Sequence, residues 1–113
     1  MTTPRDQLKL LGHIYMTNNS SYLNRKSQEY VRNLMHAVTS SQRWGISAGS
    51  LDYYLKNGWV TYDGSRNWYV NSIGFIPNNG SGYTIAIYSY GDPLNTGIGK
   101  IERISRQVAN MLK

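Results

Sequence analysis

The sequence predicts a single α+β domain in which two helices precede a three-stranded antiparallel meander and a final helix packs on the sheet. Two stretches with helical apolar periodicity come first, three strand-like runs separated by turn signals follow, and helical periodicity then returns. We expect helices at about residues 4–17, 26–39 and 98–112, and strands at about 52–62, 68–76 and 83–90. A hydrophobic fraction of 40% over 113 residues suits one domain, residues 1–113, with a modest core.

The helices are predicted from start signals and apolar stripes. Thr3, Pro4 and Asp6 supply a cap, a first-turn proline and a first-turn acid in the expected order. On the second helix, Arg32 and His36 fall on the face that should meet water. The stripes that we expect to be buried are Leu8, Leu11 and Tyr15, then Val31, Leu34, Met35 and Val38, and finally Ile101, Ile104, Val108 and Leu112.

The strands are predicted from extended apolar runs and the turns between them. Residues 63–65 (Asp-Gly-Ser) separate the first two runs, and residues 77–82, rich in Asn, Gly and Ser, separate the second from the third. In the third run Ile85 and Ile87 share one face, while the alternate positions are also apolar or aromatic. Both faces of the sheet should therefore be at least partly covered by helices.

Composition excludes several classes of function. A net charge of +6 and a pI near 9.7 suggest nucleic acid, but the twelve Lys and Arg residues are scattered and no recognised motif accompanies them, so we rank that function last. Without cysteine there is no disulfide or thiolate chemistry. His13 and His36 lack carboxylates at ligand spacing, so we expect neither metal nor cofactor. No apolar stretch approaches the roughly 20 residues of a membrane span, and no signal peptide is expected after Met1.

The most informative motif is Lys56-Asn57-Gly58, followed by Trp59, at the first predicted strand. A lysine can hold an anion, and a glycine lets another chain approach the backbone closely. Alone, this match is more often a solvated lysine beside a bulge, and Trp44 and Trp68 are more often core than ligand site. The motif gains weight from its place at the head of three strands and a terminal helix.

With Asn71-Ser72-Ile73-Gly74 on the second strand and Tyr83-Thr84-Ile85-Ala86-Ile87 on the third, this order resembles the C-terminal end of the serine β-lactamase and penicillin-binding-protein superfamily. The third signature of that superfamily is Lys-Thr-Gly or a close variant. The resemblance covers nearly all of the chain. It implies an acyl-transfer enzyme acting on a β-lactam, peptide or cell-wall substrate, whose parent protein is extracellular or in the cell envelope.

The resemblance also assigns roles to the four motif residues. Lys56 would hold the substrate anion, Asn57 would orient it in place of the usual Thr or Ser, and Gly58 would leave room for the substrate. The backbone N–H of Trp59 would donate to the developing oxyanion. An amide can still donate to a carboxylate, but its greater bulk favours a peptide, peptidoglycan or ester substrate over a β-lactam.

The nucleophile of the superfamily is absent from this sequence. No lysine has a serine three positions earlier, as Ser-x-x-Lys requires, and Ser72 lacks the flanking glycines of a nucleophile elbow, so we interpret it as a packing residue. We therefore expect the chain alone to be inactive. The family fold also implies further strands beyond residues 83–90, so the edge from Tyr83 to Tyr90 should be covered by the missing N-terminal half or by self-association. The alternative is a non-catalytic module that binds cell-wall glycan or peptide.

Overall fold

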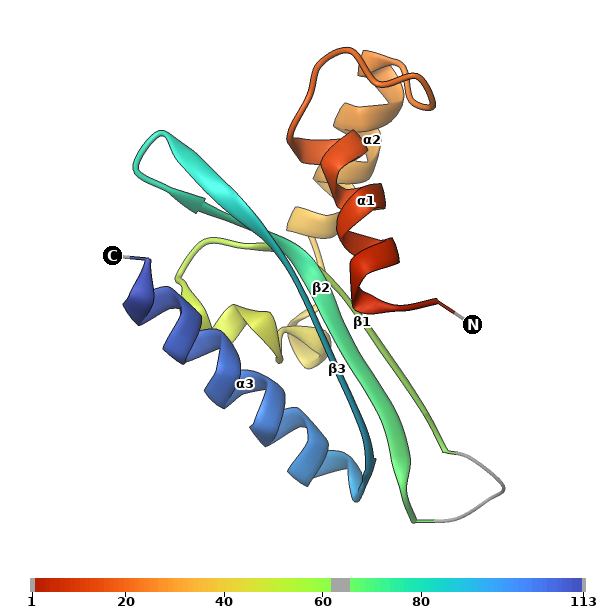
Figure 1. Cartoon of the computed structure of the whole chain (residues 1–113), viewed down its shortest axis with the longest axis vertical. Helices are drawn as coiled ribbons and strands as arrows, with labels where there is room; N and C mark the ends of the chain where they lie inside the picture. Colours follow the sequence, from red (N-terminus) through yellow and green to blue (C-terminus); the bar gives the residue numbers. More distant parts are fainter. Residues whose placement is uncertain (1, 62–65, 113) are drawn as a thin grey trace.

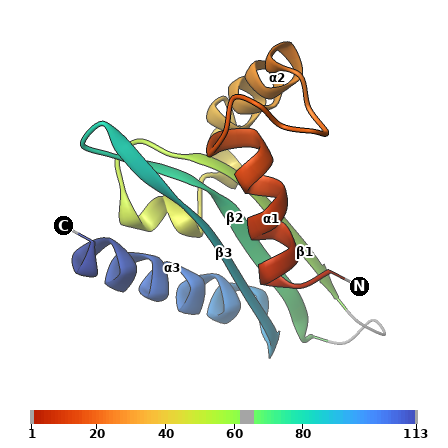
Figure 2. The same cartoon turned by 45° about the horizontal axis from the view of Figure 1, so that its top comes forward.

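The computed structural model describes residues 2–61 and 66–112 and confirms the predicted α+β order. The sheet is antiparallel with strand order β1-β2-β3. Figures 1 and 2 show α1 and α2 on one side of the sheet and α3 on the other. The elements are α1 (Pro4–Tyr15), α2 (Arg25–His36), the short 3-10 helices η1 (Ser40–Gln42) and η2 (Ile46–Gly49), β1 (Tyr54–Thr61), β2 (Trp68–Asn78), β3 (Ser81–Asp92) and α3 (Leu94–Met111).

The hairpin between β2 and β3 is tighter than the sequence suggested. Asn78 pairs with Ser81, so only Asn79 and Gly80 form the loop, and both adopt positive φ of 49° and 82°. Two positive φ angles are what a two-residue hairpin turn with the twist of the flanking strands requires. The predicted end of the first strand at residue 62 and the turn signal at 63–65 lie outside the described residues.

The last helix begins at Leu94 rather than near residue 98. The early start was hidden by Gly97 and Gly99, which weaken the helical pattern of the first turns. Gly97 is buried, and a Cβ added there would lie 3.0 Å from the Ser89 Oγ atom and 3.1 Å from a Val70 methyl group. This glycine therefore lets the start of α3 approach the sheet closely.

The main core lies between the sheet and the layer formed by η2 and α3. It is made entirely of aliphatic side chains: Ile46, Leu55, Val70, Ile76, Ile85, Ile87 and Ile101. Trp44 and Trp68, predicted to be core residues, are partly buried against this cluster. Ile104, which we expected in the buried stripe of α3, is 44% exposed, and the fully buried Ser105 takes its place against η2. The Ser105 hydroxyl donates to the Ile46 carbonyl oxygen at 2.8 Å, so a polar contact replaces the expected apolar one.

The prediction of which α2 residues are buried is also partly wrong. Leu34 is 58% exposed, whereas Gln28 is buried. The Gln28 Nε2 atom donates to the carbonyl oxygens of His13 and Thr17, at 2.6 and 2.8 Å. Arg32, predicted to face water, instead donates from Nε to the Ile14 carbonyl oxygen at 2.6 Å. These side chains satisfy carbonyl groups in the last turn of α1 and just beyond the helix, which have no partner within it.

α1 is attached to the sheet by aromatic side chains. The Tyr15 ring stacks on Phe75 of β2 with 4.9 Å between ring centroids, and it meets the Tyr54 ring of β1 edge-on. Burial raises the pKa of the Tyr15 phenol, with the neighbouring Tyr54 adding to the shift and Arg32 opposing it. The neutral hydroxyl contacts the Met35 sulfur at 3.2 Å, so Tyr15 joins α1, α2 and the sheet.

Candidate functional site

The predicted motif lies in the middle of β1, which is an edge strand of the described sheet. Lys56 is paired with Ile73, and Gly58 with Asn71, in the antiparallel register with β2. Tyr54 contacts α1 and α2, and side chains alternate along a strand, so Lys56 points to that same side of the sheet. The opposite edge of β1 has no strand beside it among the described residues.

Lys56 is an exposed cation on this edge. Its Nζ atom donates to the main-chain carbonyl oxygen of the next residue, Asn57. Within the part of the chain that the structure describes, no carboxylate forms an ion pair with it, whereas Lys100 is paired with Asp92 at 2.8 Å. Among the described residues, the Lys56 ammonium therefore has no counter-charge, and it can hold an external anion.

Asn57 does not point toward the substrate edge, contrary to the sequence-based expectation. Its side chain is 1% exposed and lies on the core side of the sheet. The Nδ2 atom donates to the main-chain carbonyl oxygens of Gln42 and Trp44, at 2.9 and 2.8 Å. The predicted role of this amide in orienting a substrate is wrong for this arrangement, because both of its N–H groups hold the segment between α2 and β1.

Gly58 is covered on one side by Asn71, a residue that was not predicted to belong to the site. A Cβ added at Gly58 would lie 3.0 Å from the Asn71 Oδ1 atom and 3.1 Å from its Nδ2 atom. The glycine therefore makes room for the amide of Asn71, which lies on the same side of the sheet as Lys56. Antiparallel pairing centred on the turn signal at residues 63–65 would set Gly58 opposite Val70, one position from Asn71, so the sequence alone does not fix this register.

The Trp59 side chain points to the opposite side of the sheet from Lys56. It is 40% exposed and meets the partly buried Trp44 edge-on, with ring centroids 5.6 Å apart. The Trp44 carbonyl oxygen is one of the two acceptors of the Asn57 amide. The buried Asn57 amide therefore holds the backbone of Trp44, whose ring contacts Trp59.

The segment that Asn57 holds is attached to two further elements. Gly45 has a φ of 90°, and a Cβ there would lie 2.3 Å from the Ser72 Oγ atom, so only glycine fits. The next residue, Ile46, donates its N–H to that Ser72 oxygen at 3.0 Å, and the Gly45 N–H donates to Glu102 of α3 at 3.2 Å. Ser72 is thus a buried acceptor in the core rather than a nucleophile at a surface.

The two remaining expectations concern a metal site and a membrane-spanning segment. Among the described residues, no three His, Asp or Glu side chains are close enough together to hold a metal ion. His13 instead contacts the Ser20 hydroxyl at 2.9 Å, and His36 contacts Asp52 at 2.8 Å. No helix in the described ranges has the length and apolar character needed to cross a bilayer.

Residues 1–112 match the family model described as the β-lactamase enzyme family. The chain belongs to this family. The resemblance stated from Lys56-Asn57-Gly58 and the order of strands is therefore confirmed. Among curated proteins, no sequence matches the chain.

Two solved structures show the same fold. One is PBP-A, and the other is a single-substitution mutant of PBP-A described as an acyl-enzyme complex with penicillin G. Each aligns with a TM-score of 0.74 and 21% sequence identity over 98% of this chain. The family member described here spans only 40% of the length of those chains.

We predict that Asn57→Ala lowers the free energy of unfolding by about 2–4 kcal/mol, because the carbonyl groups of Gln42 and Trp44 lose a buried donor. Urea denaturation followed by tryptophan fluorescence measures the change. Asn33→Ala, at an exposed position of α2, is the matched control and should change stability by less than about 0.5 kcal/mol. Equal stabilities for the two variants would contradict the anchoring role of Asn57.

Proposed function

We propose that the chain is the C-terminal portion of a serine hydrolase that transfers an acyl group from a β-lactam, peptide or cell-wall substrate. The observation that carries this proposal is the unpaired Lys56 on an edge strand, within a chain that matches the β-lactamase enzyme family over residues 1–112. The coverage of 40% of the length of PBP-A supports the view that residues outside this sequence complete the catalytic domain. A protein of this class would act outside the cell or in the cell envelope.

In this proposal Lys56 holds the carboxylate of the substrate, and the Trp59 backbone N–H donates to the oxyanion of the intermediate. A pair of unit charges about 4 Å apart contributes about 1 kcal/mol in bulk water but about 4 kcal/mol near a protein surface of lower dielectric. Lys56 is exposed in this chain, so its full effect requires the rest of the domain to close over it. Asn57 has a positioning role, and Asn71 is the amide that lies on the substrate side.

The reaction also requires a nucleophile that this sequence does not contain. An acyl-enzyme forms when an activated serine attacks the carbonyl, and no lysine here follows a serine at the Ser-x-x-Lys spacing. The buried Ser72 cannot replace it, because its oxygen accepts the Ile46 N–H within the core. The chain alone is therefore inactive in this proposal.

We expect a fluorescent penicillin to leave the isolated chain unlabelled and to label the domain once the polypeptide bearing Ser-x-x-Lys is joined to it. In the joined protein, Lys56→Ala should slow labelling at least about tenfold, because the substrate anion loses its cation. Gel fluorescence against time measures the rate. Lys9→Ala, at an exposed position of α1, should leave it unchanged. Labelling of the isolated chain, or equal rates for the two variants, would refute the assignment.

The missing portion also has a place to bind on this chain. β3 has no strand on its outer side among the described residues, and an apolar groove of about 560 Å³ lies on the sheet near the N-terminal end of α1. The groove includes Val60, Tyr69, Tyr88 and Tyr90, together with Thr2. An unpaired strand edge beside an apolar groove favours pairing with another chain. In the isolated protein, a second copy would cover this surface.

Size-exclusion chromatography with light scattering should therefore show concentration-dependent self-association of the isolated chain. Tyr90→Lys places a charge at the exposed end of this surface and should shift the protein toward monomer. Tyr30→Lys is the matched control, since Tyr30 is 67% and Tyr90 73% exposed and Tyr30 lies on α2. A monomer at all concentrations, or equal effects of the two substitutions, would argue against this surface.

A second candidate function, a non-catalytic module for cell-wall glycan or peptide, is favoured by the exposed ring of Trp59 beside Trp44. Aromatic faces bury a large apolar area, which suits sugar rings and apolar side chains. This function predicts that peptidoglycan fragments quench the tryptophan fluorescence of the isolated chain and that Trp59→Ala removes the response. Unchanged fluorescence with all fragments would exclude the module and leave the hydrolase proposal intact.

A further inference from the structure

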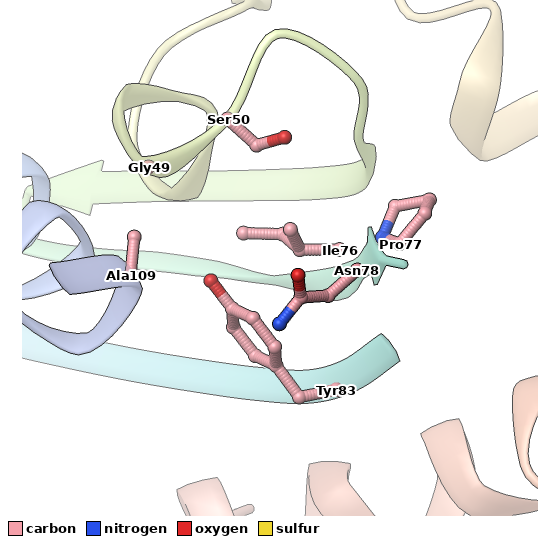
Figure 3. A pocket seen from close by; sticks show the side chains of 7 residues that line it. All are labelled: Gly49, Ser50, Ile76, Pro77, Asn78, Tyr83 and Ala109. Atoms are coloured by element: carbon pink, nitrogen blue, oxygen red, sulfur yellow. The ribbon is translucent and has the colours of Figure 1, made fainter. Parts of the chain in front are cut away.

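A small cavity lies on the α3 side of the sheet, near the hairpin that joins β2 to β3. Its volume is about 130 Å³. Figure 3 shows Tyr83 extending from β3 so that its ring and hydroxyl lie among side chains of β2 and α3. The residues that shape it include Gly49 and Ser50 of η2 and its cap, Ile76 and Asn78 of β2, and Ala109 of α3.

The hydroxyl of Tyr83 is the unusual feature of this cavity. The oxygen is buried, yet it has no hydrogen-bond partner among the described residues. Nearly all buried polar groups in proteins have a protein or solvent partner, because leaving one without a partner is destabilising. A cavity beside such a group provides room for a molecule that supplies the partner.

The lining defines the chemistry of that molecule. The lining residues carry no acidic or basic side chain, so nothing in the cavity compensates a charged ligand. The Tyr83 phenol is protonated at neutral pH and able to donate, and burial raises its pKa further above the ordinary value. Ile76 and Ala109 add apolar contact beside this donor. The volume equals that of about four water molecules, each taking roughly 30 Å³.

We propose that this cavity binds a small neutral molecule that presents a hydrogen-bond acceptor, such as an amide carbonyl, to the Tyr83 hydroxyl. The site is distinct from the proposed hydrolase site, because Ile76 and Tyr83 face α3 whereas Lys56 faces the side of α1 and α2. The bound molecule would touch η2, the hairpin and α3 together. The hairpin and α3 are already joined here, since the Asn78 Nδ2 atom donates to the Leu112 carbonyl oxygen at 3.1 Å.

The test is a titration of the whole chain with N-methylacetamide, followed through the ¹³C-labelled methyl groups of alanine and isoleucine by NMR. We expect saturable shifts that are largest at Ala109 and Ile76. Tyr83→Phe should weaken binding at least about tenfold, a loss that corresponds to one hydrogen bond to a buried group. Tyr30→Phe, at an exposed ring of α2 outside the cavity, should bind as the unchanged protein does.

A second variant tests the cavity without removing the hydroxyl. Ala109→Val partly fills the space and should also abolish the saturable shifts, which keeps the test valid if Tyr83→Phe fails to fold. Linear shifts spread over all methyl groups would mean that the cavity holds only water and would overturn the proposal. Equal affinity of the Tyr83→Phe variant would overturn it as well, because the acceptor would then not use the hydroxyl.

Discussion

The arrangement of this molecule depends on one buried amide. Asn57 reaches from the middle of β1 to two carbonyl groups of the segment that leads from α2 into the core. Without this donor, each of the two carbonyl groups would lose its hydrogen-bond partner, which would lower the free energy of unfolding by about 1–3 kcal/mol. That loss is large compared with the roughly 5–15 kcal/mol stability of a typical domain. The amide therefore couples the edge strand to the connection that must cross from one side of the sheet to the other.

Two neighbouring residues of β1 have different roles, one structural and one chemical. Alternation on a strand places Asn57 inward and its neighbour Lys56 outward. The inward residue joins the strand to the segment between α2 and β1, and the outward residue presents a cation at the surface. Ser72 and Ser105 strengthen this arrangement, because their hydroxyl groups bind the N–H and the carbonyl of Ile46. A site built on such a held strand requires little reorganisation when an anion binds.

Membership in the β-lactamase enzyme family gives these features a common explanation. The chain has the fold of PBP-A over 98% of its own length but only 40% of the length of PBP-A. In our proposal a larger domain accounts for the exposed lysine, the apolar groove and the β3 edge that has no strand beside it among the described residues. The cavity beside Tyr83 differs from them because it lies within the layer formed by the sheet, η2 and α3, and in our proposal its hydroxyl donates to a small molecule rather than to another chain.

The sequence by itself determined the order of helices and strands and the resemblance to the family, because periodicity, turn residues and a short motif are local signals. It did not determine which polar side chains are buried. Apolar periodicity does not predict the burial of the polar residues Gln28, Asn57 and Ser105. Each is buried because its side chain hydrogen-bonds to a main-chain group far away in the sequence. The inward direction of Asn57 and the cover that Asn71 gives to Gly58 follow from strand register and packing. Only the tertiary structure decides these, since a hydrogen bond between distant segments leaves no periodic trace in the chain.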